Sequence, residues 1–222
     1  MILLDRGGAC MAEITALKPD PKHPARVQVF LDGRRWRVIP VPAAAGLRVG
    51  MSLDPKAQQQ IEDRSSEAAA LERVGRLLVE RPRSEAEVRQ RLERAGTAPE
   101  TIDQVVLRLR HSGDLDDGSF ARVWVENRMT FRPRGAALLR AELRRKGVAS
   151  TEIDSALAEV DEPEAAWAAV QRAAQRWAGL DPSARRQKLY AFLQRRGFDY
   201  DTIRQVLHRL QAAADGDSEE TP

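Results

Sequence analysis

The chain of 222 residues has only one cysteine, Cys10, and three histidines, and aromatic residues make up just 5% of it. A single cysteine excludes an internal disulfide framework and is typical of a reducing compartment, so we expect a cytoplasmic protein. The histidines, His23, His111 and His208, lie far apart in the sequence. Together with one cysteine they give no spacing typical of a zinc site, and we expect no bound metal.

Motifs of catalysis and of membrane insertion are missing as well. The sequence has no glycine-rich phosphate loop and no nucleophile elbow. No apolar run reaches the about 20 residues that a membrane helix needs. At the start of the chain Asp5 and Arg6 follow a short apolar run, which makes a poor secretion signal. We therefore expect a non-enzymatic protein without cofactor or membrane contact, and we interpret residues 1–11 as a non-native or flexible extension.

What the chain does have is a block that occurs three times, at a spacing of about fifty residues. The three copies align on Gly96, Gly147 and Gly197. Apolar residues recur at five further positions, namely Val88, Leu139 and Leu189; Leu92, Leu143 and Leu193; Ile102, Ile153 and Ile203; Val106, Leu157 and Leu207; and Leu109, Val160 and Leu210. Spacings of three and four residues predict one apolar stripe on each of two helices. The glycine between them suits a left-handed helix cap.

Each block also has a helix before it. Pro82 and Pro133 stand fourteen residues ahead of their aligned glycines and Pro182 stands fifteen ahead, where one helix ends and the next begins. Ser84 with Glu87, and Thr97 with Glu100, read as capping boxes at helix starts. We predict a mainly α fold of three tandem three-helix repeats, residues 65–113, 114–160 and 161–210, that form an elongated curved array.

The N-terminal segment has a different pattern. Residues 14–17, 27–31 and 36–41 are rich in β-forming side chains, and Asp32-Gly33 is a strong hairpin signal. We predict a small β-containing segment over residues 12–64, in which residues 55–61 form a short helix. Residues 211–222 are acidic, and we expect a flexible tail there.

Basic residues are the main sign of function. The net charge is only +3, but arginines gather on the second helix of each repeat. If the repeats stack, these helices form a basic stripe, defined here as Arg89, Arg91, Arg94, Arg128, Arg132, Arg134, Arg140, Arg144, Arg145, Lys146, Arg185, Arg186, Lys188, Arg195 and Arg196. Such a stripe is typical of a surface that binds a polyanion or an acidic protein. The alternative is an ordinary solvated arginine-rich surface.

An acidic cluster, Asp114, Asp116 and Asp117, lies at a predicted turn. A calcium loop would need a ladder of ligands over twelve residues, and none follows. We interpret the cluster as an N-cap of the helix that starts near Ser119, because carboxylates accept hydrogen bonds from the free N–H groups of a first turn. Contact with a metal ion or a partner protein is the alternative.

The same region carries a resemblance to a known family. The run from Gly113 to Ala121, followed by Val125, Glu126, Asn127 and Arg128, resembles the central signature of the RecX family of bacterial RecA regulators. Within it Asp116, Asp117, Phe120 and Ala121 match the paired aspartates and the aromatic-alanine pair. Residues 77–88 and 92–102 are similar to the family's first repeat, and residues 143–148 to its second. The third repeat, with its proline one residue out of step, is the least similar.

The resemblance implies a function that the residues alone do not name. A RecX-like protein is expected to be a monomer that binds the RecA filament on single-stranded DNA, in the helical groove of the filament. It would inhibit recombination, ATPase and coprotease activity in DNA repair and the SOS response. The residues leave two alternatives open, a stand-alone helical-repeat protein that binds nucleic acid without sequence preference, and a helical scaffold without a nucleic-acid role.

Overall fold

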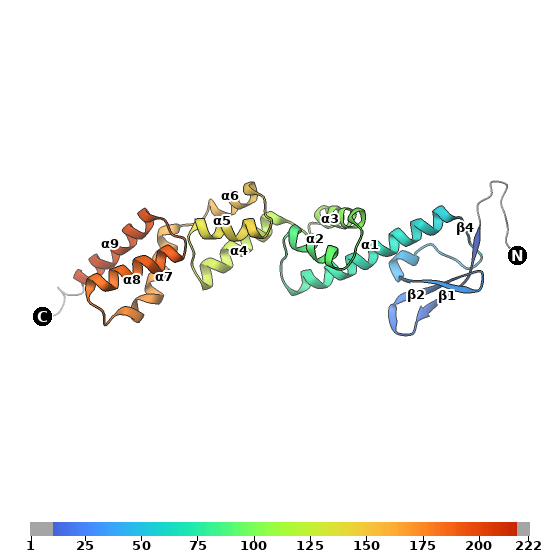
Figure 1. The fold of residues 1–222 in the computed structure, drawn as a ribbon, viewed down its shortest axis with the longest axis horizontal. Coiled ribbons are helices and arrows are strands. Elements are labelled where there is room, and N and C mark those ends of the chain that lie inside the picture. Colours follow the sequence, from blue (N-terminus) through green and yellow to red (C-terminus); the bar gives the residue numbers. More distant parts are fainter. Residues whose placement is uncertain (1–10, 217–222) are drawn as a thin grey trace. The chain divides into compact units, whose positions relative to one another are not determined.

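The computed structural model describes residues 11–216. The predicted N-terminal extension, apart from Met11, and the end of the predicted acidic tail lie outside these residues. The chain divides into two compact bodies. The N-terminal body comprises Met1–Pro82 and Val88–Asp114, and the C-terminal body comprises Arg83–Glu87 and Leu115–Pro222. Figure 1 gives the order of the elements along the chain.

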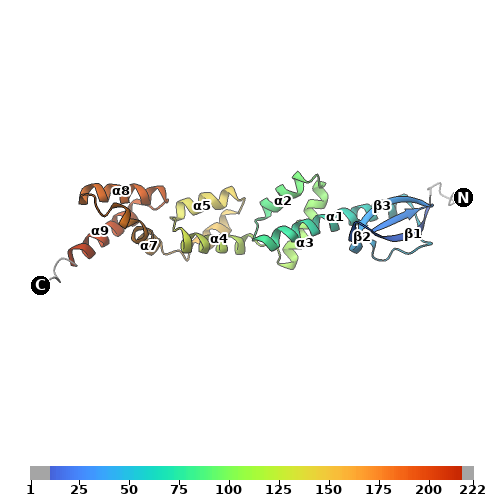
Figure 2. The same ribbon diagram turned by 90° about the horizontal axis from the view of Figure 1, so that it is seen from below.

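The N-terminal body begins with a four-stranded antiparallel sheet (Figure 2). Its strands are β1 (Ala12–Asp20), β2 (His23–Leu31), β3 (Arg34–Pro40) and β4 (Ser52–Leu53), in the order β3-β2-β1-β4, and a short 3-10 helix, Val41–Ala44, follows β3. The predicted hairpin is confirmed. Asp32 and Gly33 connect β2 to β3 with φ angles of 47° and 78°, which is the left-handed backbone that a tight two-residue hairpin turn requires.

Helix α1 (Pro55–Glu80) covers one face of this sheet. Ile61 of α1 packs in the same core as Ile14, Val29 and Ile39, and all four side chains are almost fully buried. Each such side chain contributes about 1.5–3 kcal/mol by leaving water. Val29 and Leu31 of β2 are buried in this core, with the half-buried Phe30 between them, so one face of the sheet packs on α1.

The length of α1 differs from the prediction. We expected a short helix over residues 55–61 and a separate first helix in the first repeat, but α1 is continuous over 26 residues. Asp54 caps its start by accepting a hydrogen bond from the Ala57 N–H at 2.6 Å, with Pro55 in the first turn. Neither proline nor glycine occurs from Glu62 to Val74, so nothing stops the helix at the predicted boundary between residues 64 and 65.

The first three-helix module consists of the second half of α1, α2 (Glu85–Arg94) and α3 (Pro99–Ser112). The predicted capping box of α2 is confirmed, since the Glu87 N–H donates to Ser84 Oγ and the Ser84 N–H donates to the Glu87 carboxylate. The predicted box of Thr97 and Glu100 is wrong. Helix α3 starts one residue later than that box requires, with Ala98 as N-cap and no side-chain bond, because Pro99 occupies the first helical position.

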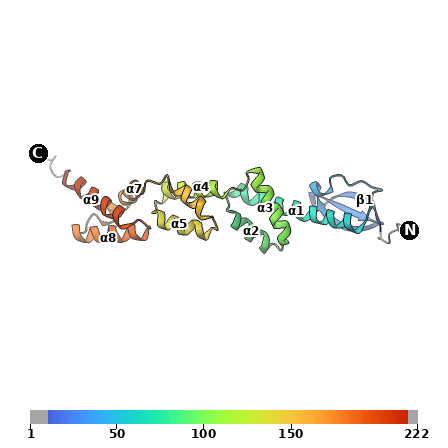
Figure 3. The ribbon, with the colours of Figure 1, turned by 90° about the horizontal axis from the view of Figure 1, so that it is seen from above.

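The C-terminal body holds the second and third modules (Figure 3). The second is α4 (Asp117–Phe131), α5 (Ala136–Arg145) and α6 (Ser150–Leu157). The third is α7 (Glu162–Ala174), α8 (Pro182–Arg195) and α9 (Tyr200–Gly216), with a 3-10 turn, Gln175–Trp177, after α7. Each module has its own apolar core. Helix α9 continues beyond residue 210, where we predicted the tail to begin.

The predicted repeat is confirmed in the core. Leu92, Leu143 and Leu193 have no exposed side-chain surface in their respective modules. The three aligned glycines have φ angles of 73°, 78° and 82°, which is the left-handed conformation expected at the end of a helix. The described residues thus form a mainly α protein of three three-helix modules with a small N-terminal sheet.

Two of the three glycines also make a close contact within the C-terminal body. A Cβ atom added to Gly147 would clash with the side chain of Ala86, and one added to Gly197 would clash with Leu138. Backbone bonds lie beside these contacts, since Ser84 Oγ donates to the Lys146 carbonyl at 2.6 Å and the Gly135 N–H donates to the Arg196 carbonyl at 2.9 Å. The first turn of one second helix therefore packs against the end of the next second helix, at both junctions.

Candidate partner-binding surface

The acidic signature is built into the start of α4. Asp116 is the N-cap, with one carboxylate oxygen 2.9 Å from the Gly118 N–H and the other 2.7 Å from Ser119 Oγ. The hydrogen bond from Ser119 is the main cause that lowers the pKa of Asp116 below its ordinary value of 3.8. Phe120 and Ala121, which follow, are buried in the second module's core. Asp116 therefore has the predicted capping role.

Asp117 also accepts a backbone hydrogen bond, but from a different helix. Its carboxylate accepts a hydrogen bond from the Glu85 N–H at 2.8 Å, which ties the first turn of α2 to the first turn of α4 within the C-terminal body. Over residues 11–216 no group of histidine, cysteine, aspartate and glutamate has the arrangement of a metal site. The pair thus stabilises backbone N–H groups at helix starts.

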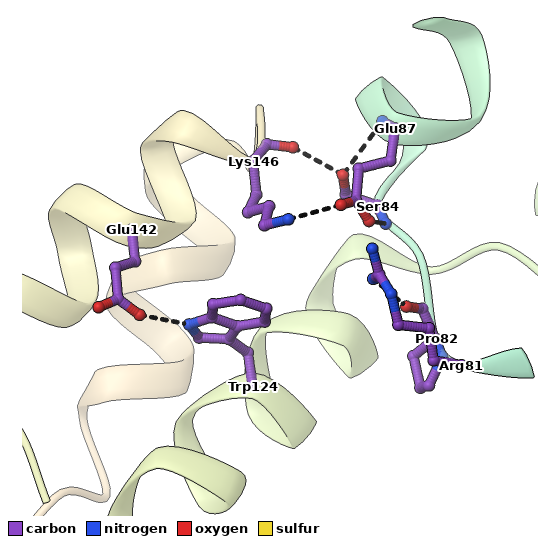
Figure 4. Close-up of polar contacts among 7 residues, drawn as sticks. All are labelled: Arg81, Pro82, Ser84, Glu87, Trp124, Glu142 and Lys146. Atoms are coloured by element: carbon purple, nitrogen blue, oxygen red, sulfur yellow. Dashed lines mark hydrogen bonds and ion pairs between the residues drawn. The ribbon is translucent and has the colours of Figure 1, made fainter. Parts of the chain in front are cut away.

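A second group of internal contacts surrounds Glu142, which is the only acidic residue between Arg128 and Lys146 in the sequence (Figure 4). Its side chain is buried, accepts two hydrogen bonds through one carboxylate oxygen and forms an ion pair through the other. Trp124 Nε1 donates to one carboxylate oxygen at 3.0 Å, Arg128 Nε donates to the same oxygen at 3.1 Å, and Arg134 forms an ion pair with the other. Burial lowers the pKa of Arg134 below its ordinary value, as do the neighbouring guanidiniums, and the Glu142 carboxylate is the charge that compensates.

The indole of Trp124 lies between two cations of this centre. The Arg128 guanidinium is 4.3 Å from the ring centroid, and Lys146 Nζ is 5.2 Å from it. Lys146 also pairs with Glu87 at 2.5 Å, as Figure 4 shows. Internal ion pairs and cation–π contacts therefore engage the charged groups of Arg128, Arg134 and Lys146, and these contacts stabilise the second module.

A third group of arginines lies where the second module meets the third, inside the C-terminal body. Arg196 Nη1 donates to the Pro133 carbonyl at 2.9 Å, and its guanidinium lies 4.7 Å from the Phe192 ring centroid. Arg172 Nη1 donates to the Thr130 carbonyl at 3.0 Å. Arg172 thus holds the end of α4, and Arg196 holds the segment between α4 and α5.

The charges that lower the pKa of Arg196 are all positive. Burial lowers the pKa of Arg196, and the like charges of Arg132, Arg176 and Arg172 lower it further. Arg132 and Arg176 are exposed, and within residues 11–216 their side chains have neither a hydrogen bond nor an ion pair. We call Arg132, Arg172, Arg176 and Arg196 the arginine cluster. An anion with several negative groups would relieve its repulsion.

The structure separates the predicted basic stripe into three groups by contacts and exposure. One group already makes an internal ion pair, a ring contact or a side-chain hydrogen bond to another helix or loop. Its members are Arg89 (with Asp103), Arg128, Arg134, Arg140 (with Asp154), Lys146, Arg186 (with Gln211) and Arg196. Arg185 is half-buried. The exposed remainder is Arg91, Arg94, Arg132, Arg144, Arg145, Lys188 and Arg195. This remainder is the part of the stripe that can reach a ligand without a change in the fold.

Comparison with known proteins gives the family. The family models described as the first, second and third three-helix domains of RecX match residues 70–109, 116–157 and 159–207. The protein of Prosthecochloris aestuarii named Regulatory protein RecX is 40% identical over 141 residues, which cover 64% of this chain and 93% of that one. The chain belongs to the RecX family.

Other relatives extend the likeness over nearly the whole chain. Regulatory protein RecX of Levilactobacillus brevis is 30% identical over 214 residues, which cover 94% of this chain and 80% of its own length. A crystal structure of regulatory protein RecX superposes with a TM-score of 0.72 at 24% identity, over 88% of this chain and 98% of that one. RecX from Lactobacillus salivarius has a TM-score of 0.61 at 19% identity, over 66% and 97% of the two chains. These two structures show the same fold.

Sequence reasoning missed two members of the arginine cluster of this RecX protein. Arg172 and Arg176 lie in α7 and the turn after it, whereas the predicted basic stripe lies mainly on second helices. Their spacing of four residues, which puts both on one helix face, is a signal that could have found them.

In the part of the chain that the structure describes, no helix has the length and apolar character of a membrane crossing.

Proposed function

We propose that this RecX-family protein is a non-enzymatic regulator that binds the RecA filament on single-stranded DNA and inhibits it. The name Regulatory protein RecX, which its relatives carry, supports a regulatory role. Binding in the helical groove of the filament would then reduce strand exchange, ATP hydrolysis and coprotease activity during DNA repair and the SOS response. The protein acts in the cytoplasm, as a monomer.

The observation that carries the proposal is the arginine cluster with the exposed arginines of the basic stripe. Arg132 and Arg176 have no internal partner among residues 11–216, while Arg144 and Arg145 are exposed at the end of α5. Guanidinium groups suit phosphate because they donate in pairs, and their charge releases counterions from nucleic acid. These side chains would contact the DNA backbone or acidic groups of RecA.

Inhibition needs no chemistry in this scheme. A protein that binds one state of a filament more tightly than another shifts the equilibrium by the ratio of the two affinities. A regulator that prefers the filament in a form that hydrolyses ATP slowly will lower the ATPase rate while it stays bound.

The test is co-sedimentation with RecA filaments on single-stranded DNA, together with the ATPase rate. We expect the protein to sediment with the filaments and to lower the rate at fewer than one copy per RecA monomer. A full titration without any change in sedimentation or rate would contradict the proposal.

Stand-alone binding of nucleic acid is the second candidate, and the arginine cluster favours it too. Base-specific binding usually places Asn or Gln beside Arg, but the exposed members of the basic stripe and of the arginine cluster are nearly all arginine. We therefore expect any direct binding of nucleic acid to have no sequence preference. Fluorescence anisotropy with labelled single-stranded DNA and no RecA distinguishes the candidates, since the second requires tight binding in the absence of RecA.

A further inference from the structure

The third helix of the second module is shorter than its counterparts. Helix α6 has 8 residues, whereas α3 has 14 and α9 has 17. In the repeat, Val160 corresponds to Leu109 of α3 and Leu210 of α9, but it lies beyond the end of α6. The local sequence explains the early end, because Pro163 would break the interior of a longer α6 but suits the first turn of α7, which Asp161 already caps.

The missing turns of α6 leave part of α4 uncovered. A pocket of about 520 Å³ lies there, between α4, the end of α6 and the start of α7. Its apolar lining comes from Val125, Met129, Ala156, Val160 and Ala165. Met129, Val160 and Ala165 are only half-buried, so a ligand can still cover them.

Carboxylates surround this apolar lining. Glu126 and Glu159 are exposed, and neither has a hydrogen bond or ion pair among residues 11–216. Asp161 also lines the pocket and accepts the Glu164 N–H at 3.0 Å. Arg122 is the one base in the lining, and it donates to Ser119 Oγ at 2.8 Å. With three acids against one base, the pocket differs in sign from the arginine cluster.

We propose that this pocket binds a segment of a partner protein that carries a long apolar side chain next to lysine or arginine. The apolar side chain would contact Met129 and Val160, in the space that further turns of α6 would fill. The cationic group would pair with Glu126 and Glu159. Nucleic acid does not fit, because its phosphates would face these carboxylates. The identity of the partner rests on the proposed function, under which the segment belongs to RecA.

The pocket can be tested without RecA. The probe is an acetylated peptide amide of alternating lysine pairs and leucine pairs, added to the isotopically labelled full-length protein and followed by amide chemical shifts in NMR. We expect shifts at the C-terminal half of α4, the end of α6 and the start of α7. A peptide with glutamate in place of lysine, and one with serine in place of leucine, should each cause much smaller shifts.

Variants locate the contact. Glu126→Lys with Glu159→Lys should weaken the affinity for the lysine-leucine peptide about tenfold, since two attractive pairs become repulsive. Asp201→Lys is the matched control, because Asp201 is an exposed acid on α9 outside the pocket, and it should leave the affinity unchanged. Circular dichroism and the thermal midpoint confirm that each variant is folded.

Three results would overturn the proposed binding pocket. They are chemical-shift changes only elsewhere on the protein, an equal loss of peptide affinity in the control variant, and no chemical-shift changes at millimolar peptide. Loss of self-association in the double variant would also overturn it, because the occupant would then be a second copy. If the peptide binds at the pocket but the wild-type protein does not sediment with RecA filaments, the proposed function fails while the pocket stands.

Discussion

Arginines meet in two places in the C-terminal body, with opposite outcomes. At the first, Arg128 and Arg134 converge on the buried carboxylate of Glu142, and their charge is balanced inside the protein. At the second, Arg172 and Arg196 bond to backbone carbonyls, and Arg132 and Arg176 add charge without an acid to balance it. Arg132 of the second place lies in the same arginine-rich stretch of sequence as Arg128 and Arg134 of the first. Arginine content therefore predicts a binding surface only where the fold supplies no carboxylate.

Removal of the Glu142 carboxylate, on which Arg128 and Arg134 converge, has the largest expected effect on stability. Glu142→Gln keeps the size of the side chain but leaves Arg128 and Arg134 without a charge partner. Loss of one member of a buried pair typically costs about 3–5 kcal/mol. We expect a fall of about 3 kcal/mol in the free energy of unfolding, measured by urea denaturation, because Arg128 is partly exposed.

The control is Glu126→Gln, an exposed acid two residues after Trp124 on α4, which should change the unfolding free energy by less than about 0.5 kcal/mol. Equal stability of both variants would mean that Glu142 does not hold the centre together, and that Arg128 and Arg134 are available to a ligand after all.

The role of Glu142 shows what a single sequence leaves open. Its partners lie 8 to 18 residues away, on the preceding helix α4 and in the turn before α5, and only the packing of α4 on α5 brings them together. The stripe of Leu92, Leu143 and Leu193 was predictable because its period belongs to the helix itself. Local signals failed where a stronger neighbour competed, as Pro99 did with the expected cap at Thr97.

The glycines that end the second helices extend the comparison to backbone packing. Gly147→Ala combines the left-handed backbone, which costs about 1–2 kcal/mol, with a clash against Ala86, which adds about 1–3 kcal/mol. Gly96→Ala has the same backbone cost, but no atom lies near the added Cβ. We expect a destabilisation of about 3 kcal/mol for Gly147→Ala and of about 1 kcal/mol for Gly96→Ala, measured by thermal and urea unfolding.

Similar losses for the two glycine variants would show that the first turn of α2 does not rest on the end of α5. The tight junction inside the C-terminal body would then add nothing to stability beyond the strain of the residue itself.

Substitution in the arginine cluster should affect binding and leave stability intact, whereas substitution of Glu142 should lower stability. Arg132→Ala with Arg176→Ala removes two charges that have no internal partner, so stability should stay the same or rise slightly. Binding to single-stranded DNA should weaken, and the slope of log affinity against log salt concentration should decrease by about two. Anisotropy titrations at several salt concentrations measure both.

Arg76→Ala with Arg108→Ala is the matched control, because it removes two exposed arginines that pair with Glu72 and Glu67 in the N-terminal body. If control and cluster variants reduce the salt slope equally, the positive charge acts as a diffuse field and the cluster is no specific contact.

The smallest expected effect belongs to Asp116, whose carboxylate is balanced by hydrogen bonds at the start of α4. Asp116→Ala should cost about 1 kcal/mol, as for other N-caps. The pKa of Asp116 is lowered in the folded state, so its contribution is present at neutral pH and is lost as the pH falls below the ordinary value of 3.8 and through the folded value. Wild type and variant should therefore approach equal stability in acid. DNA binding and RecA inhibition should fall only in proportion to unfolding, and chelators should have no effect. Asp116→Asn, which can still accept a hydrogen bond at the cap, should recover most of the stability. Full stability with lost inhibition in Asp116→Ala would instead assign the aspartate to the partner-binding surface.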